Sequence, residues 1–75
     1  MWSKGFINGE NGRRYEYQVK HFDEGSEFGI NEGRISKLWI SLDGKTVCSY
    51  DRGWDVFPED DYIKNVYNKL LDRFN

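Results

Sequence analysis

The sequence predicts a small α+β domain in which a four-stranded antiparallel β-meander carries one C-terminal α-helix on one face. Three observations lead to this ββββα, two-layer prediction. Short runs of alternating apolar and polar residues fill the first two thirds of the chain, Asn-Gly and Asp-Gly pairs separate them, and one amphipathic stretch follows. The chain has no linker or internal repeat, so we expect a single domain over residues 1–75.

The first two strands are expected to form a hairpin. Residues 2–8 supply the first strand, and the next residues, up to Gly12, contain two Asn-Gly pairs, which tolerate the positive φ angles of tight turns. Residues 13–22 then alternate with a period of two, which indicates a strand with one buried face. The side chains expected on its buried face are Tyr15, Tyr17 and Val19.

Residues 35–42 are predicted to form the third strand, and residues 45–50 or 45–51 the fourth. Asp43 and Gly44 between them make a turn of the kind that joins adjacent antiparallel strands. The side chains of the third strand expected to face the core are Leu38, Ile40 and Leu42. Trp39 then belongs to the opposite face of the sheet.

Residues 23–34 are predicted to be a loop, which is long for a compact domain. Three glycines (Gly25, Gly29 and Gly33) are expected to give it backbone freedom. Phe28 and Ile30 lie among its acidic residues, either as apolar anchors within a polar rim or as side chains that fold back to cap the core or cover Trp39.

The helix is predicted over residues 58–73, after Gly53 ends the regular structure. Pro58 suits a first helical position, and the acidic residues 59–61 favour the positive end of the helix. Apolar residues then recur at helical spacing: Ile63, Val66, Tyr67, Leu70 and Phe74. This stripe is expected to cover one face of the sheet and to leave the other face open.

The composition limits the class of protein. Thirteen of the 75 residues are aromatic, which suits the core of a domain of this size. The net charge of −2 argues against a broad phosphate-binding surface. A single cysteine excludes an internal disulfide, and no stretch is typical of a signal peptide or a membrane span, so we expect a cytoplasmic protein.

No catalytic, cofactor-binding or metal-binding residue is predicted, and we expect a non-enzymatic protein. Nothing in the spacing brings Cys48, the only thiol, near His21, the only imidazole. Three acidic residues of the loop (Asp23, Glu24 and Glu27) do not match a calcium-binding loop, and a solvated acidic loop explains them better.

Two parts of the chain are candidates for binding. Trp39 next to Lys37 on the open face resembles the stacking platforms that bind single-stranded nucleic acid, although a Trp half-covered by a neighbouring loop, through Phe28 and Ile30, explains it better. The turn with Arg52 and Trp54 forms either an internal ion-pair and cation–π cluster or a recognition element.

Three stretches resemble a small family that occurs in Gram-positive bacteria and their phages or mobile elements, and that has no assigned activity. The stretches are Ser26-Glu27-Phe28-Gly29-Ile30, Gly33-Arg34-Ile35-Ser36-Lys37-Leu38-Trp39-Ile40 and Tyr50-Asp51-Arg52-Gly53-Trp54-Asp55. The resemblance implies an accessory protein of a phage or mobile element and assigns no role to any residue.

The leading hypothesis is a protein-interaction module that binds its partner through the loop 23–34 and the turn at Arg52 and Trp54. The alternative is a single-stranded nucleic-acid binder that uses the open sheet face around Trp39. The oligomeric state and the identity of a partner do not follow from the sequence.

Overall fold

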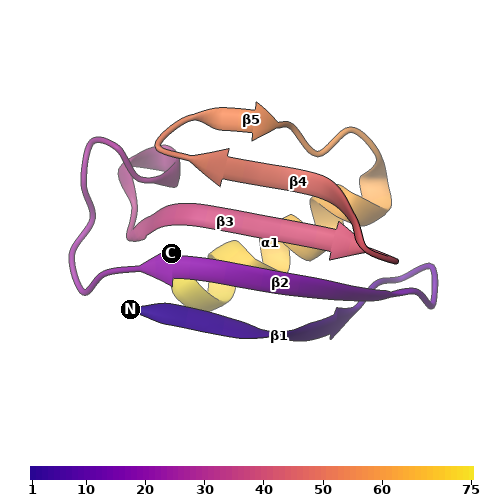
Figure 1. Ribbon diagram of the computed structural model, residues 1–75. Helices are drawn as coiled ribbons and strands as arrows, with labels where there is room; N and C mark the ends of the chain where they lie inside the picture. The colour runs from indigo at the N-terminus through magenta and orange to yellow at the C-terminus, as the bar shows by residue number, and fades with distance from the viewer.

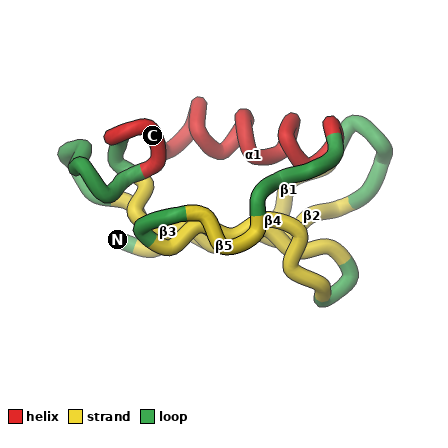
Figure 2. Tube along the Cα trace, turned by 90° about the horizontal axis from the view of Figure 1, so that it is seen from above, coloured by secondary structure: helices red, strands yellow, loops and turns green.

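The computed structural model describes residues 1–75 as a five-stranded antiparallel sheet with one helix lying along one of its faces (Figures 1 and 2). This confirms the predicted two-layer α+β architecture. A short 3₁₀ turn, η1, lies within the long loop. The elements are β1 (Trp2–Asn8), β2 (Arg14–His21), η1 (Ile30–Glu32), β3 (Ile35–Leu42), β4 (Lys45–Asp51), β5 (Trp54–Val56) and α1 (Asp61–Phe74).

The strands follow one another across the sheet in chain order, as in a meander (Figure 1). The prediction of four strands is wrong, because β5 pairs with β4 through Trp54 opposite Tyr50 and Val56 opposite Ser49. The chain reverses at Arg52, which adopts a positive φ of 57°. Three residues are too few to show a period of two, so the sequence pattern contained no sign of this strand.

The predicted alternation is confirmed in β2 and β3, and β4 extends the same rows. Val19 lies opposite Leu38, and Leu38 lies opposite Tyr50, so the three side chains share the face beneath the helix. The next row on that face runs from Tyr17 to Ile40 and Cys48. The main buried side chains of this face are Tyr15, Tyr17, Val19, Leu38, Ile40, Cys48 and Tyr50, with Leu42 partly buried beside them. Asp43 and Gly44 both have positive φ, as the predicted tight turn requires.

Helix α1 begins later than predicted. Asp60 is its N-cap, since its side-chain oxygen accepts a hydrogen bond of 2.7 Å from the backbone N–H of Ile63. Pro58 lies before the helix, where its side chain is buried. Pro58 and Asp60 both suit the start of a helix, and the helix starts after Asp60 because its side chain forms the capping hydrogen bond. The apolar stripe packs as expected, with Ile63, Val66 and Leu70 buried and Tyr67 partly buried.

The loop 23–34 is fastened to the rest of the domain. The Asn75 side chain accepts a hydrogen bond from the N–H of Ile35 and donates one to the carbonyl of Ile30, so it joins the end of α1 to this loop. The loop glycines do not have positive φ. Gly29 and Gly33 are needed for space instead, because a Cβ on Gly29 would collide with the carbonyl oxygen of Gly33, and one on Gly33 with the Asn75 side chain. The expected backbone freedom is therefore replaced by close packing.

Figure 2 shows α1 along one side of the sheet and no other element along the opposite side. The two faces of the sheet therefore differ in their surroundings. One face packs against α1 and forms the core, and the other presents the side chains of the strands to solvent.

Candidate functional site

Cross-strand pairing brings aromatic and basic side chains together on the open face. Neighbours across an antiparallel sheet share a face, so the register defines rows that run from β1 to β3. The first row contains Trp2, Lys20 and Lys37, the second Lys4, Gln18 and Trp39, and the third Phe6, Glu16 and Ser41.

The two tryptophans of this face stack on each other. The ring centroids of Trp2 and Trp39 lie 5.8 Å apart, and the ring planes are inclined by 21°. Trp39 is partly buried, and 46% of the Trp2 surface is exposed. The expectation that Phe28 and Ile30 cover Trp39 is wrong, because Trp2 stacks on this ring and Ile30 is buried in the core. The signal that could have found Trp2 is its position in β1, where Trp2, Lys4 and Phe6 alternate onto the open face.

Cations accompany the aromatic rings of the open face. The Arg14 guanidinium lies 3.9 Å from the centroid of the Phe6 ring, and the Lys20 ammonium lies 6.0 Å from that of Trp2. Lys37 forms an ion pair of 3.7 Å with Asp51. On this face, strands β1 to β3 carry four basic side chains (Lys4, Arg14, Lys20 and Lys37) and one acidic side chain, Glu16. Asp51 of β4, which pairs with Lys37, adds a second acidic side chain. The chain as a whole has more acidic than basic residues, so positive charge is concentrated here.

The residues of the first binding hypothesis are only partly brought together. Ile30 is a core residue with 2% of its surface exposed, so it cannot serve as an anchor for a partner. Phe28 is 54% exposed, and the guanidinium of Arg52 lies 5.8 Å from its ring centroid. Tyr50 donates a hydrogen bond of 2.9 Å from its hydroxyl to the carbonyl of Phe28 and so holds the loop against β4.

Trp54 belongs to the helix side of the sheet. Its ring meets those of Phe57 and Tyr67 edge-on, at centroid distances of 4.9 and 5.4 Å, and 38% of its surface is exposed. The proposed internal cluster around Arg52 does not form, because its guanidinium lies over Phe28 and Asp51 pairs with Lys37. Phe28, Arg52 and Trp54 thus remain as a second, smaller candidate surface.

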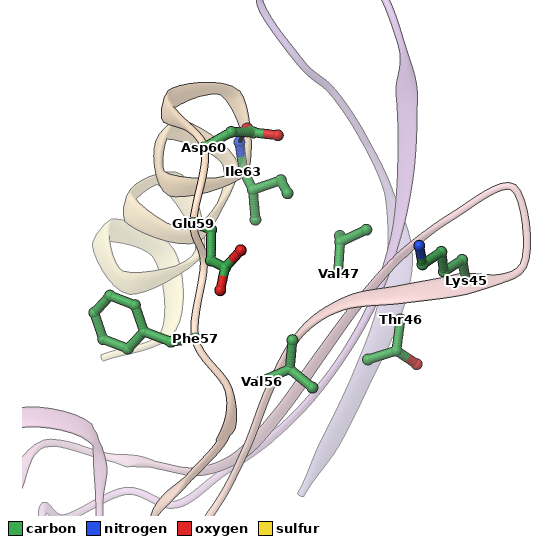
Figure 3. A pocket seen from close by; sticks show the side chains of 8 residues that line it. All are labelled: Lys45, Thr46, Val47, Val56, Phe57, Glu59, Asp60 and Ile63. Atoms are coloured by element: carbon green, nitrogen blue, oxygen red, sulfur yellow. Dashed lines mark hydrogen bonds between the residues drawn. The ribbon is translucent and has the colours of Figure 1, made fainter.

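A hollow of about 380 Å³ opens between β4, β5 and the start of α1 (Figure 3). The apolar side chains of Val47, Val56 and Ile63 line it, while Phe57 points away on the far side of its segment. Glu59 extends its carboxylate into the hollow. Asp60, which also lines it, already caps α1. The hollow holds neither an imidazole nor a thiol, and it offers no acid–base pair with an evident task.

Cys48 and His21 are not brought together. Cys48 lies on the helix side of β4, in the same cross-strand row as Ile40 of β3 and Tyr17 of β2. His21 lies four residues after Tyr17, at the far end of β2. Burial raises the pKa of the Cys48 thiol to about 12, so the thiolate that a nucleophile needs is disfavoured. His21 shares a hydrogen bond of 2.9 Å with the Ser3 hydroxyl, and its ring lies 4.9 Å from that of Phe74. Its partial burial, followed by the positive charges of the N-terminus and Arg34, lowers its pKa.

The structure gathers no group of three or more His, Cys, Asp or Glu side chains that could hold a metal ion. The acidic loop residues Asp23, Glu24 and Glu27 are exposed, in agreement with a solvated loop.

The domain contains no helix with the length and hydrophobicity needed to cross a bilayer. Comparison with curated proteins finds no match, and comparison with solved structures finds none either. One family of small domains, described as "Domain of unknown function (DUF7678)", matches residues 1–75, and the chain therefore belongs to this family.

Proposed function

We propose that the protein is a non-enzymatic binding module whose open sheet face holds single-stranded nucleic acid. The observation that carries this proposal is the stacked pair of Trp2 and Trp39 on a face that also bears Lys4, Lys20 and Lys37. Aromatic rings on an exposed sheet stack with unpaired bases, and neighbouring cations bind the phosphates between them.

The geometry favours a single strand over a duplex. Bases in a duplex are stacked on each other and present no free ring face, whereas an unpaired base can lie flat on an indole. Trp2 and Phe6 are about half exposed and lie at the edge of the sheet in β1, where bases can reach the parts of these rings that Trp39 and Arg14 leave uncovered. The open face therefore offers two or three aromatic contacts.

The distribution of charge supports the same partner. Among the residues of this face in β1–β3, together with Asp51, are four of the eleven basic residues and two of the thirteen acidic ones. The acidic remainder of the chain repels phosphate and restricts a nucleic acid to this face. With four cations available, the logarithm of the affinity should fall with the logarithm of the salt concentration with a slope no steeper than about −3.

The first test is a fluorescence-anisotropy titration of labelled single-stranded DNA and RNA oligomers of about 12 nucleotides, a length within the usual range of such sites. Trp39→Ala should weaken binding by about 5- to 150-fold, the equivalent of the ~1–3 kcal/mol that one stacked base contributes. Trp54→Ala is the matched control, because it removes a partly exposed tryptophan from the helix side. Equal losses in the two folded variants, or no binding by the unmodified protein, would rule out this function.

A second candidate function is protein recognition by Phe28, Arg52 and Trp54. The specific observation in its favour is the exposed Phe28 ring beneath the Arg52 guanidinium, since Arg and large aromatic residues are enriched at binding hot spots. Acidic residues precede and follow Phe28 in the loop 23–34, and they suit a partner with basic side chains.

Phe28→Ala tests this candidate against a purely structural role. Because the ring is half exposed, the loss in the free energy of unfolding should stay well below the ~3 kcal/mol typical of a buried phenylalanine. Capture of a partner from the native host's lysate by the unmodified protein, and its loss with Phe28→Ala, would support protein recognition. A large loss of stability would identify Phe28 as a structural residue. We place either function in the cytoplasm, in an accessory protein of a phage or mobile element, as the resemblance and the single cysteine imply.

A further inference from the structure

We propose that a hollow beside the stacked tryptophans reads one base of the bound strand, and that Gln18 gives this position a preference for adenine. This inference rests on the proposed function and adds the base for which the nucleic-acid surface is specific. The hollow measures about 380 Å³ and lies on the open face. Its lining residues are Trp2, Gln18, Trp39, Ser41 and Thr46.

The register explains why these side chains meet. Gln18 lies directly opposite Trp39 on the neighbouring strand, and Ser41 follows two residues after Trp39 on the same face. Thr46 pairs with Ser41 across β3 and β4, beyond the irregularity that shifts the register after Ile40. A base that stacks on the indole of Trp39 therefore has three polar side chains around its edge.

The polar groups of the hollow are free and uncharged. The side-chain hydrogen bonds within the chain use other residues, so the carboxamide of Gln18 and the hydroxyls of Ser41 and Thr46 remain available. No acidic or basic side chain lines the hollow. Lys4 lies opposite Gln18 on β1, outside the lining, where it can bind the phosphate of the same nucleotide. A neutral hollow next to a cation fits a base with its phosphate outside.

The chemistry of the carboxamide favours adenine. A glutamine side chain offers one acceptor and one donor side by side, and it forms two hydrogen bonds with the N6 and N7 atoms of adenine. In a single strand the N6 and N1 atoms provide a second complementary edge, because no opposite strand occupies them. Cytosine, thymine and guanine also present an adjacent donor and acceptor on the edge used in base pairing, whereas the outer edge of guanine (O6 and N7) offers acceptors alone. Of the two edges that face away from the sugar, adenine therefore presents this pair on both, and each other base presents it on one. A purine also covers more of the Trp39 ring than a pyrimidine does.

The test is a set of titrations with oligomers of equal length containing only adenine, only cytosine, only thymine, or guanine spaced by thymine. The unmodified protein should bind the adenine oligomer about tenfold more tightly than the others. Gln18→Met keeps the length of the side chain and removes both hydrogen-bonding groups, so the four affinities should converge to within about threefold. Lys4→Ala should weaken all four by a similar factor and leave the preference intact.

The outcomes separate this inference from the proposed function. Measurable binding with equal affinity for the four oligomers overturns the reading of a base, while it leaves nucleic-acid binding in place. A preference for adenine that survives in Gln18→Met also overturns it, because the preference would then come from stacking alone. A lack of binding to every oligomer, with a protein partner captured instead, would refute the proposed function itself and this inference with it.

Discussion

The two faces of the sheet are built from the same strands and are both rich in aromatic residues, yet they differ in exposure and in charge. On the covered face Tyr15 and Tyr17 lie beneath α1 and are almost inaccessible to solvent. On the open face Trp2 and Phe6 remain about half exposed, and Lys20 and Arg14 lie over their rings. Both faces therefore carry aromatic rings, and the open face differs in that its rings are exposed and lie beside cations.

This comparison makes a general prediction about substitutions. A change on the covered face should lower the free energy of unfolding and leave nucleic-acid binding by the folded fraction intact. A change on the open face should weaken nucleic-acid binding and leave the free energy of unfolding nearly unchanged. The three changes below act on the covered side and follow in order of expected effect, and each is checked against that rule.

The largest loss of stability is expected for Leu70→Ala. The Leu70 side chain is fully buried between α1 and the sheet, and truncation of such leucines costs about 2–5 kcal/mol. Urea denaturation should therefore show a much lower midpoint. Lys69→Ala is the matched control on the exposed side of the same turn and should change stability by about 0.5 kcal/mol at most. An unchanged midpoint for Leu70→Ala would mean that the covered face is wrongly assigned.

The next effect concerns the pH dependence of the covered face at Cys48. Burial raises its pKa from 9.0 in the unfolded chain to about 12 in the fold, so the folded state holds the proton more tightly. The resulting stabilisation is complete below pH 9 and is lost as the pH rises from about 9 towards 12.

Unfolding by urea at pH 8 and pH 10.5 measures this loss. The free energy of unfolding of Cys48→Ala should fall less between the two pH values than that of the unmodified protein. Burial also raises the pKa of Tyr67, so this residue should account for part of the fall that remains in Cys48→Ala. A thiol reagent should label Cys48 only after unfolding. Rapid labelling of the native protein would show that this face is open to water.

A smaller effect is expected at the start of the helix that covers the sheet. Asp60→Ala removes the hydrogen bond to the N–H of Ile63 and should cost about 1 kcal/mol, as losses of N-caps do. Asp60→Ser retains an oxygen that can accept this bond and should recover most of the stability. Thermal unfolding followed by circular dichroism compares the three proteins. Equal stability of Asp60→Ala and the unmodified protein would show that the helix does not depend on this cap.

Much of the fold could be predicted from the sequence, because local patterns determine it. The alternation in β2 and β3 and the Asp43-Gly44 turn identified the covered face and the faces of Trp39 and Leu38 correctly. The fifth strand escaped prediction because its three residues show no period. The start of α1 was misplaced because the choice between Pro58 and Asp60 depends on a hydrogen bond that forms only in the folded chain.

The candidate site was less predictable, because its contacts cross strands. Trp2 and Trp39 are 37 positions apart in the sequence and meet diagonally over β2, so no local pattern links them. In the same way, the role of Gly33 depends on Asn75 at the end of α1, which no spacing within the loop reveals. The position of Ile30 among the acidic residues of a long loop favours an anchor for a partner over a core residue, and only the folded chain, in which the η1 turn holds Ile30 in the core, decides between them.

The most direct test of the open face uses the three tryptophans of the chain as reporters. Each indole N–H gives its own signal in a ¹⁵N–¹H correlation spectrum, and the structure places Trp2 and Trp39 on the open face and Trp54 on the helix side. Titration with a single-stranded oligomer should shift the signals of Trp2 and Trp39 and leave that of Trp54 in place. A shift confined to Trp54, or none at saturating oligomer, would contradict the assignment of the open face as the nucleic-acid surface.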